Sequence, residues 1–172
     1  MKIVNIVAVA KTDTTFNLAD LAGRISETEF PPKAPWLKMR IKPENYYVAF
    51  YKSGKFLITG FTEIDLIDRL SQRVMRILRE AGILVKLKSV DVVNIVLTEK
   101  VELNKPLDQL VRFLDDSRAS YEPEQFPWLL YKDTDGVSFT VFRSGKMIIT
   151  GLKSLERGKK SFKRFKALLD ML

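Results

Sequence analysis

Residues 48–60 read VAFYKSGKFLITG, and residues 140–151 read TVFRSGKMIITG. Both stretches contain an aromatic residue, a basic residue, Ser-Gly-Lys, three apolar residues and Thr-Gly. In each of them a Ser-Gly pair separates two apolar runs, which predicts a tight hairpin between two strands. The same local structure is therefore expected twice in this chain.

Two further pairs of matching segments flank the hairpins in the same order. VNIV at residues 4–7 returns at residues 93–96, and PWL at residues 35–37 returns at residues 127–129. The matching segments are offset by 89, 91 and 92 residues, which indicates an internal duplication of one long unit. We expect a first repeat over residues 1–89 and a second over residues 90–172, related by a pseudo-two-fold axis.

Each repeat has the same expected order of elements: a strand, a short helix, a Pro-containing turn, strands joined by turns, and a long helix. Thr62 is the expected N-cap of the first long helix, and Gly82 its expected stop. The last helix carries an apolar stripe of Leu155, Phe162, Phe165, Leu168, Leu169 and Leu172. The expected strands include residues 3–10 and 90–97, and the long helices cover residues 63–81 and 154 to the end.

The hairpin strands are apolar or small on both faces. Val48 and Phe50 alternate with Ala49 and Tyr51, whereas a sheet with one solvated face should alternate apolar with polar residues. Helices can cover one face, so the other would be an apolar surface of the kind that marks a binding site. The alternative is that both faces are buried, within the protein or in an oligomer. The basic residues expected at the rim of that surface are Lys38, Arg40, Lys52, Lys55, Lys132, Arg143 and Lys146.

The charge and composition narrow the classes of function. The net charge is +8, of which +6 falls in residues 1–89. This basic excess suggests a polyanionic partner such as nucleic acid, but it is common enough that charge alone leaves a merely soluble basic protein as the alternative. Histidine and cysteine are both absent, which removes the commonest general base and the commonest zinc ligands. No phosphate-binding glycine motif is present. We therefore expect no enzyme, cofactor or metal site, and no membrane span, because no apolar run approaches about 20 residues.

The chain resembles the core domain of the TATA-box-binding protein family over residues 2–172. The resemblance rests on the Asn-Ile-Val strand, YEPEQFP at residues 121–127, FRSGK at residues 142–146 and the paired Thr-Gly. It implies an α+β fold of two tandem pseudo-symmetric repeats, which form a saddle-shaped antiparallel sheet of ten strands with four helices on the convex face. It also implies a concave face that binds and bends TATA-box DNA through the minor groove during transcription initiation.

The resemblance assigns roles to individual residues. Those matching the minor-groove contacts of the family are Asn5, Val7, Leu57, Thr59, Asn94, Val96, Ile148 and Thr150. Those matching its phosphate contacts are Arg40, Ser53, Lys55, Lys132, Ser144 and Lys146. Phe126 and Phe142 match the phenylalanine pair that wedges into a base step in the second repeat, and Glu122 and Glu124 match the residues that bind transcription factor B.

The implied partners are double-stranded promoter DNA, transcription factor B and, indirectly, RNA polymerase. The protein would be a monomer on DNA and a weak dimer when free. It would act in the cytoplasm of an archaeal cell or in the nucleus of a eukaryotic one.

The first repeat departs from the family pattern. Tyr51 stands at one wedge position, and Ala34 stands where the family has the second phenylalanine. Trp36 lies nearby and could take over the wedge, although Trp128 shows that this tryptophan is shared by both repeats. Counting back from the first-repeat tryptophan, Phe30 and Pro32 occupy the places of the two glutamates. Only the second repeat is then expected to bind transcription factor B.

Two other functions remain compatible with the sequence. One is a regulatory paralogue that engages transcription factor B without binding TATA DNA, which the missing phenylalanine keeps open. The other is a saddle domain that binds an RNA–DNA hybrid or a protein. The last helix also has a basic face, which is either simply solvated or a surface for another factor: Arg157, Lys159, Lys160, Lys163, Arg164 and Lys166.

Overall fold

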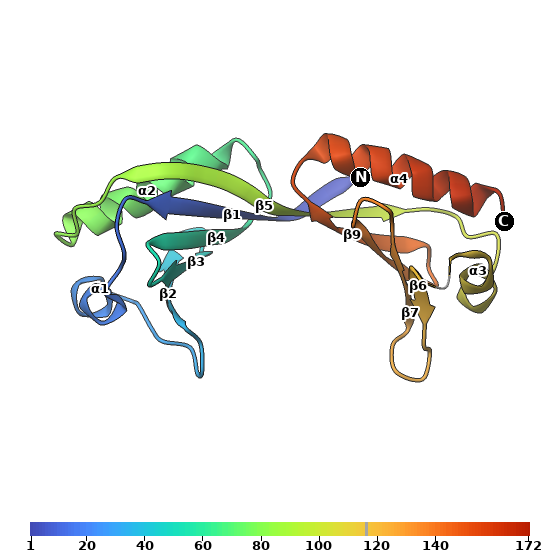
Figure 1. The fold of residues 1–172 in the computed structure, drawn as a ribbon, viewed down its shortest axis with the longest axis horizontal. Helices are drawn as coiled ribbons and strands as arrows, with labels where there is room; N and C mark the ends of the chain where they lie inside the picture. Colours follow the sequence, from blue (N-terminus) through green and yellow to red (C-terminus); the bar gives the residue numbers. More distant parts are fainter. Residues whose placement is uncertain (116) are drawn as a thin grey trace. The chain divides into compact units, whose positions relative to one another are not determined.

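The computed structural model describes residues 1–115 and 117–172, in which four helices pack against antiparallel strands (Figure 1). The strands are hydrogen-bonded in the order β2-β3-β4-β1-β5-β9-β8-β7-β6. The elements are β1 (Lys2–Thr12), α1 (Leu18–Arg24), β2 (Trp36–Ile41), β3 (Tyr46–Tyr51), β4 (Lys55–Phe61), α2 (Leu66–Glu80), β5 (Leu87–Lys100), α3 (Leu107–Phe113), β6 (Ala119–Tyr121), β7 (Trp128–Lys132), β8 (Ser138–Phe142), β9 (Lys146–Leu152) and α4 (Leu155–Asp170).

The chain divides into two compact units. The N-terminal unit comprises residues 5–93, and the C-terminal unit comprises residues 1–4 and 94–172. In the N-terminal unit α1 contacts β2 and α2 contacts β4, and in the C-terminal unit α3 contacts β6 and β7 and α4 contacts β9. Each unit therefore repeats the expected order of strand, short helix, strands and long helix.

A glycine in a left-handed conformation makes each β-hairpin possible. Gly54 has φ +80° and Gly145 has φ +77°, values that favour glycine. A Cβ atom at these positions would also lie 1.9 Å from the carbonyl oxygens of Thr14 and Val101, respectively. Glycine is thus required in both turns by its φ angle and by its close contacts, and the hairpins predicted from the Ser-Gly pairs are confirmed.

Nine strands are present in the described residues, rather than the ten that the family resemblance implied. The N-terminal counterpart of β6 is reduced to a single β-bridge between Glu29 and Lys38. Pro31 and Pro32 follow that bridge, and because proline has no backbone N–H it cannot extend a ladder of hydrogen bonds.

The helix predicted at residues 63–81 begins later than expected. Hydrogen bonds from Leu66 N to Glu63 O and from Ile67 N to Ile64 O form a tighter turn before α2. The assignment of Thr62 as N-cap was therefore wrong, since the N-cap is Asp65, which makes no side-chain capping bond. The predicted stop is confirmed: Gly82 has φ +76°, with the double hydrogen bond of a Schellman motif around it.

Helix α4 approaches the sheet closely through a glycine. A Cβ on Gly158 would meet side-chain atoms of Leu97 and Leu152 at 2.8 and 2.9 Å, so the backbone itself packs on the strands. This shifts the buried face of the helix relative to the predicted apolar stripe. Phe165 and Leu169 of the predicted stripe are buried, but Leu168 of the same stripe is 40% exposed.

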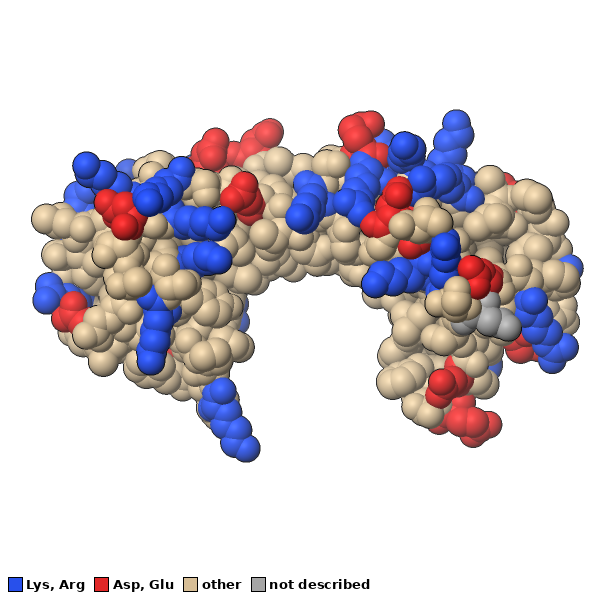
Figure 2. Space-filling view, viewed as in Figure 1, with Lys and Arg blue, Asp and Glu red and all other residues tan. Residues whose placement is uncertain are grey.

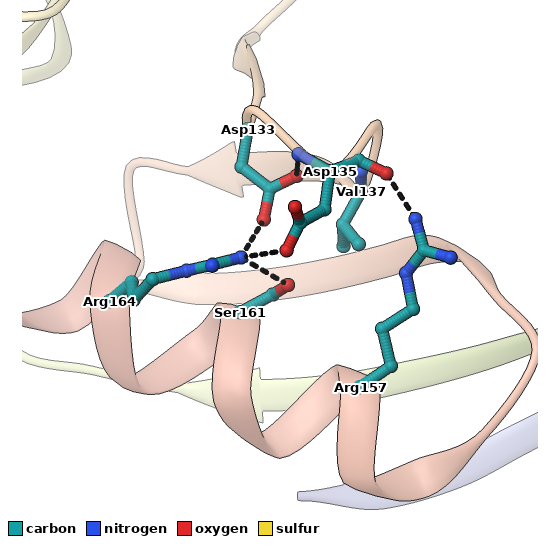
Figure 3. A network of polar contacts seen from close by, with 6 residues as sticks. All are labelled: Asp133, Asp135, Val137, Arg157, Ser161 and Arg164. Atoms are coloured by element: carbon teal, nitrogen blue, oxygen red, sulfur yellow. Dashed lines mark hydrogen bonds and ion pairs between the residues drawn. The ribbon is translucent and has the colours of Figure 1, made fainter.

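Basic residues of α4 fasten the turn between β7 and β8 to the helix (Figure 3). Arg164 binds both Asp133 and Asp135, and Arg157 donates to the main-chain oxygen of Asp135. The hydrogen bond from Arg164 lowers the pKa of the Asp135 carboxyl. Lys159 and Lys166 pair with acidic residues of the same helix. Much of the basic face noted in the sequence is therefore engaged within the chain.

Candidate nucleic-acid interface

Each unit buries one face of its strands under helices and leaves the other face accessible. In β1, Ile6, Ala8 and Ala10 are at most 1% exposed, whereas Val7 and Val9 between them are partly exposed. We call the second, accessible side the open face. In the N-terminal unit it carries Asn5, Val7, Val9, Lys11, Trp36, Lys38, Arg40, Tyr47, Ala49, Tyr51, Lys55, Leu57 and Thr59.

The C-terminal unit has the corresponding open face. Its residues pair across strands as Thr98 with Ile148 and Thr140 with Ile148, and they alternate with a fully buried set that includes Leu97 and Ile149. Burial of both faces within the chain is thereby excluded for the described residues. The open face here carries Asn94, Val96, Thr98, Lys100, Trp128, Leu130, Lys132, Ser138, Thr140, Phe142, Lys146, Ile148 and Thr150.

A backbone N–H group orients the asparagine on each open face. Asn5 Oδ1 accepts from Gly60 N at 3.0 Å, and Asn94 Oδ1 accepts from Gly151 N at 3.0 Å. Because a backbone N–H can only donate, the oxygen must face the glycine and the amide nitrogen must point away from it. Neither Nδ2 atom donates to another described residue, so each amide can donate to a ligand. The Thr-Gly repeat thus positions the asparagine as well as supplying the threonine.

The two threonines of the repeat are used differently. Thr59 Oγ1 donates to Asn5 Oδ1 at 3.1 Å, so its proton is engaged within the N-terminal unit. Thr150 makes no such bond among the described residues, which leaves its hydroxyl proton available. The C-terminal open face therefore offers two donors, and the N-terminal one offers a single donor in the same arrangement.

An aromatic cluster stands at the outer end of the C-terminal open face. Phe126 stacks on Trp128 with ring centroids 5.1 Å apart, and Trp128 contacts Phe142 at 5.9 Å. Phe126 is nevertheless 48% exposed. Trp128 thus supports an apolar ring that the fold leaves in solvent, an arrangement that favours a ligand contact over core packing.

The equivalent part of the N-terminal unit is arranged differently. The Trp36 indole donates its N–H to the Tyr47 hydroxyl at 2.8 Å, and Ala49, which lies between Tyr47 and Tyr51 along β3, is only 1% exposed. Tyr51 lies 6.0 Å from Trp36 between ring centroids, and burial raises the pKa of its hydroxyl. Trp36 is therefore tethered to β3 by its polar edge, while Ala34 leaves the second wedge position without an aromatic ring.

The expected phosphate contacts lie on or beside the open faces. Arg40 and Lys132 are exposed on β2 and β7, and Ser53 and Ser144 lie in the hairpin turns beside Lys55 and Lys146. Three other basic residues predicted at the rim are placed differently. Lys38 pairs with Glu29, and Lys52 and Arg143 lie in the hairpin turns rather than on strands. Arg143 donates to the Tyr121 hydroxyl, which raises the pKa of its guanidinium.

The loop between β6 and β7 presents the two glutamates. Glu122 and Glu124 are exposed, and neither forms an ion pair with another described residue. The main-chain oxygen of Glu122 accepts from Phe126 N at 2.8 Å, so the loop that presents the carboxylates also fixes the wedge residue. Figure 2 shows acidic atoms at the tip of this loop.

In the corresponding loop of the N-terminal unit, the strand pairing aligns the two repeats one residue away from the alignment obtained by counting back from Trp36. Glu29 bridges to Lys38 as Ser120 pairs with Leu130, so Phe30 corresponds to Tyr121 and not to a glutamate. The loop that follows, residues 31–35, contains no carboxylate. The expected asymmetry in acidic residues therefore stands, although the residues named for it were misaligned.

Seven residues of the open faces were missed by the sequence reasoning: Val9, Lys11, Tyr47, Thr98, Lys100, Leu130 and Ser138. Alternation along β1, β3, β5, β7 and β8 from the asparagines, Tyr51, Trp128 and Thr140 would have identified them. In the described part of the chain, no cluster of three or more acidic, histidine or cysteine side chains could hold a metal ion, and no helix has the length and apolarity of a membrane span.

Comparison with known proteins gives a consistent result. Residues 1–81 and 89–172 match the family model described as transcription factor TFIID, or TATA-binding protein. The chain is 32% identical to a TATA-box-binding protein of Archaeoglobus fulgidus, over 100% of this chain and 96% of that protein. It is 35% identical to one from Methanococcus aeolicus, over 91% and 86% of the two chains. The structure of Methanococcus jannaschii TBP matches with a TM-score of 0.84 at 29% identity, over 99% of this chain and 98% of that one.

Proposed function

The chain belongs to the TATA-box-binding protein family, and from that premise we propose that it binds TATA-box promoter DNA through the minor groove, bends it, and recruits transcription factor B and thereby RNA polymerase. The family consists of DNA-binding transcription initiation factors, and the expected fold class is confirmed by the structural match. The proposal contains no catalytic step.

The observation that carries the proposal is the fixed orientation of the two asparagine amides. The minor groove of an A·T pair displays only acceptors, adenine N3 and thymine O2, whereas a G·C pair adds the guanine amine. Asn5 and Asn94 present donors because Gly60 and Gly151 occupy their oxygens. A donor held in this way matches A·T pairs and meets the guanine amine, another donor, unfavourably.

The apolar part of each open face supports the same partner. Val7 and Leu57 in one unit, and Val96 and Ile148 in the other, are partly exposed in the free protein. They can pack against a groove floor that lacks exocyclic amines. We propose that Phe126 and Phe142 unstack a base step, at a cost of a few kcal/mol that wider protein–DNA contact offsets.

Recruitment of transcription factor B is proposed for the β6–β7 loop. Glu122 and Glu124 are exposed and unpaired among the described residues, so basic residues of a partner could bind them without displacing an internal ion pair. Reversal of both charges to lysine should leave binary DNA binding nearly intact and abolish the ternary complex on native gels. A matched control reverses Glu63, which precedes α2, and Glu80, the last residue of that helix; both are exposed. A ternary complex that survives the first reversal at physiological salt would remove this part of the proposal.

The bending proposal can be tested by energy transfer between dyes at the two ends of a TATA duplex. We expect the dyes to approach each other on addition of protein. A scrambled duplex and an RNA–DNA hybrid of equal length serve as controls and should show no comparable change. A larger response from the hybrid than from the TATA duplex would favour the hybrid-binding alternative, and equal responses from all three would contradict TATA-specific bending.

The regulatory paralogue remains a second candidate because of one observation, Ala34 at a wedge position in an N-terminal unit whose Trp36 is bonded to Tyr47. Such a protein would bind transcription factor B through the β6–β7 loop with no TATA duplex present. A ternary complex that forms only with the duplex favours the initiation factor instead.

A further inference from the structure

Four lysines on the open faces stand in two cross-strand pairs. Lys11 of β1 lies directly opposite Lys55 of β4, and Lys100 of β5 lies directly opposite Lys146 of β9. Residues directly opposite on one face of an antiparallel pair have Cβ atoms about 5 Å apart, and like charges there are destabilising. The same repulsive arrangement occurs in both units, at the same end of the same strands.

The internal structure offers these lysines no compensation. None of the four forms an ion pair with another described residue, and all four are exposed. The contrast with Lys38 is informative, because its cross-strand neighbour on the open face is Glu29, with which it pairs. At the two lysine pairs, the residue on the neighbouring strand is a second lysine, whereas opposite Lys38 it is a carboxylate.

Protection of a sheet edge does not explain the pairs either. Exposed lysines on edge strands block unwanted strand addition. However, β4 lies between β3 and β1, and β9 lies between β5 and β8, so the paired lysines sit on interior strands. A ligand of opposite charge is the remaining compensation.

We propose that each lysine pair is a binding site for two neighbouring phosphodiester groups of the nucleic-acid backbone, one at each lysine, so that Lys11 and Lys100 act as phosphate contacts alongside Lys55 and Lys146. The C-terminal pair lines a hollow of about 510 Å³ together with Ser144 and Glu99, and the Glu99 carboxylate is already paired with the N-terminal ammonium group. A phosphate at each lysine accepts a charge-assisted hydrogen bond from its ammonium group, and the added negative charges offset the repulsion within the pair.

This inference rests on the proposed function in that it assumes a nucleic-acid ligand, but it makes separate predictions. Neutralising a phosphate contact lowers the slope of log K against log salt by about 0.9 on duplex DNA, whatever its sequence. Lys11→Gln and Lys100→Gln should each lower the slope by about 0.9, and the double variant by about 1.8. Lys100→Arg should keep the wild-type slope, as should Lys163→Gln on the exposed face of α4.

The stability of the free protein gives a second readout. Because each substitution relieves a repulsion, Lys11→Gln and Lys100→Gln should maintain or raise the melting temperature at low salt, and the difference should vanish at high salt. A lower melting temperature at low salt would overturn the inference, since the lysines would then be stabilising the fold.

The salt titration is run on a TATA duplex and on a scrambled duplex. Reduced slopes on both duplexes support the lysine pairs, even if the wild type shows no TATA preference and the proposed function falls. Wild-type slopes in both single variants, in a protein that does prefer TATA, overturn the lysine pairs and leave the proposed function intact.

Discussion

Replacement of Asn94 by Asp tests the orientation of the amide with the smallest possible change. The carboxylate is nearly isosteric with the amide, and one of its oxygens can still accept from Gly151 N, now at 3.0 Å from Asn94 Oδ1. The atom that changes is the one aimed at the ligand, where an N–H donor becomes a charged acceptor. Folding stability should therefore change by less than about 0.5 kcal/mol, as for other surface substitutions.

The expected loss of DNA affinity combines two effects. Loss of the hydrogen bond to an adenine N3 or thymine O2 costs about 0.5–1.5 kcal/mol. A carboxylate then faces the groove acceptors without a partner in a desolvated interface, which costs about 2–4 kcal/mol more. The sum of about 2.5–5.5 kcal/mol corresponds to a roughly 60- to 8000-fold weaker complex.

Fluorescence anisotropy with a labelled TATA duplex at fixed salt measures this loss, and urea titration measures the stability. Asn104→Asp is the matched control, because it adds the same charge in an exposed loop of the same unit and should change affinity less than about threefold at physiological salt. An Asn94→Asp protein that is folded and binds within threefold of the wild type would refute the role given to the amide.

Three further predictions follow from the structure. Phe126→Ala should weaken TATA binding by about 1–3 kcal/mol and reduce the bend, as a lost base-stacking contact does, whereas Ala34→Phe should tighten binding; equal bends at both ends of the wild-type site would contradict this asymmetry. Tyr47→Phe should lower the free energy of unfolding by about 0.5–1.5 kcal/mol in urea titrations, because it removes the acceptor of the Trp36 indole N–H. The same substitution should leave DNA bending unchanged if Trp36 does not wedge into a base step. The pKa of Asp135 is lowered by Arg164, so its stabilising contribution is present above the ordinary aspartate pKa of about 4 and is lost as pH falls through the lowered value; Asp135→Asn should flatten the acid limb of a stability-against-pH curve, and an unchanged limb would contradict the pairing.

Repetition made much of the fold predictable. The Ser-Gly-Lys and Thr-Gly matches located both hairpins because tight turns depend on local residue types, as Gly54 and Gly145 illustrate. Strand alternation then divided residues correctly between a buried and an accessible face. The start of α2 and the orientation of α4 were less predictable, because they depend on a tight turn at residues 63–67 and on Gly158 packing against the strands.

The finer features of the candidate site depend on which residues stand opposite each other, and a single sequence does not specify this register. The lysine pairs become visible only when β1 is aligned with β4 and β5 with β9. The bond between Trp36 and Tyr47 joins residues four positions apart along paired strands, and no local pattern indicates it. The hydrogen bond from a glycine N–H to each asparagine side chain likewise depends on the register shift in the strand pairing beside it.

The central claim is that the open faces read the minor groove of A·T pairs, and inosine substitution tests it most directly. An inosine·cytosine pair has the minor groove of an A·T pair, since inosine lacks the guanine amine, but the major groove of a G·C pair. Binding should be of similar strength to a TATA duplex and to the same site rebuilt with inosine·cytosine pairs, and weaker by about 10³-fold or more to the site rebuilt with G·C pairs. If the inosine duplex were bound as weakly as the G·C duplex, or if all three were bound equally, minor-groove readout by these residues would be contradicted.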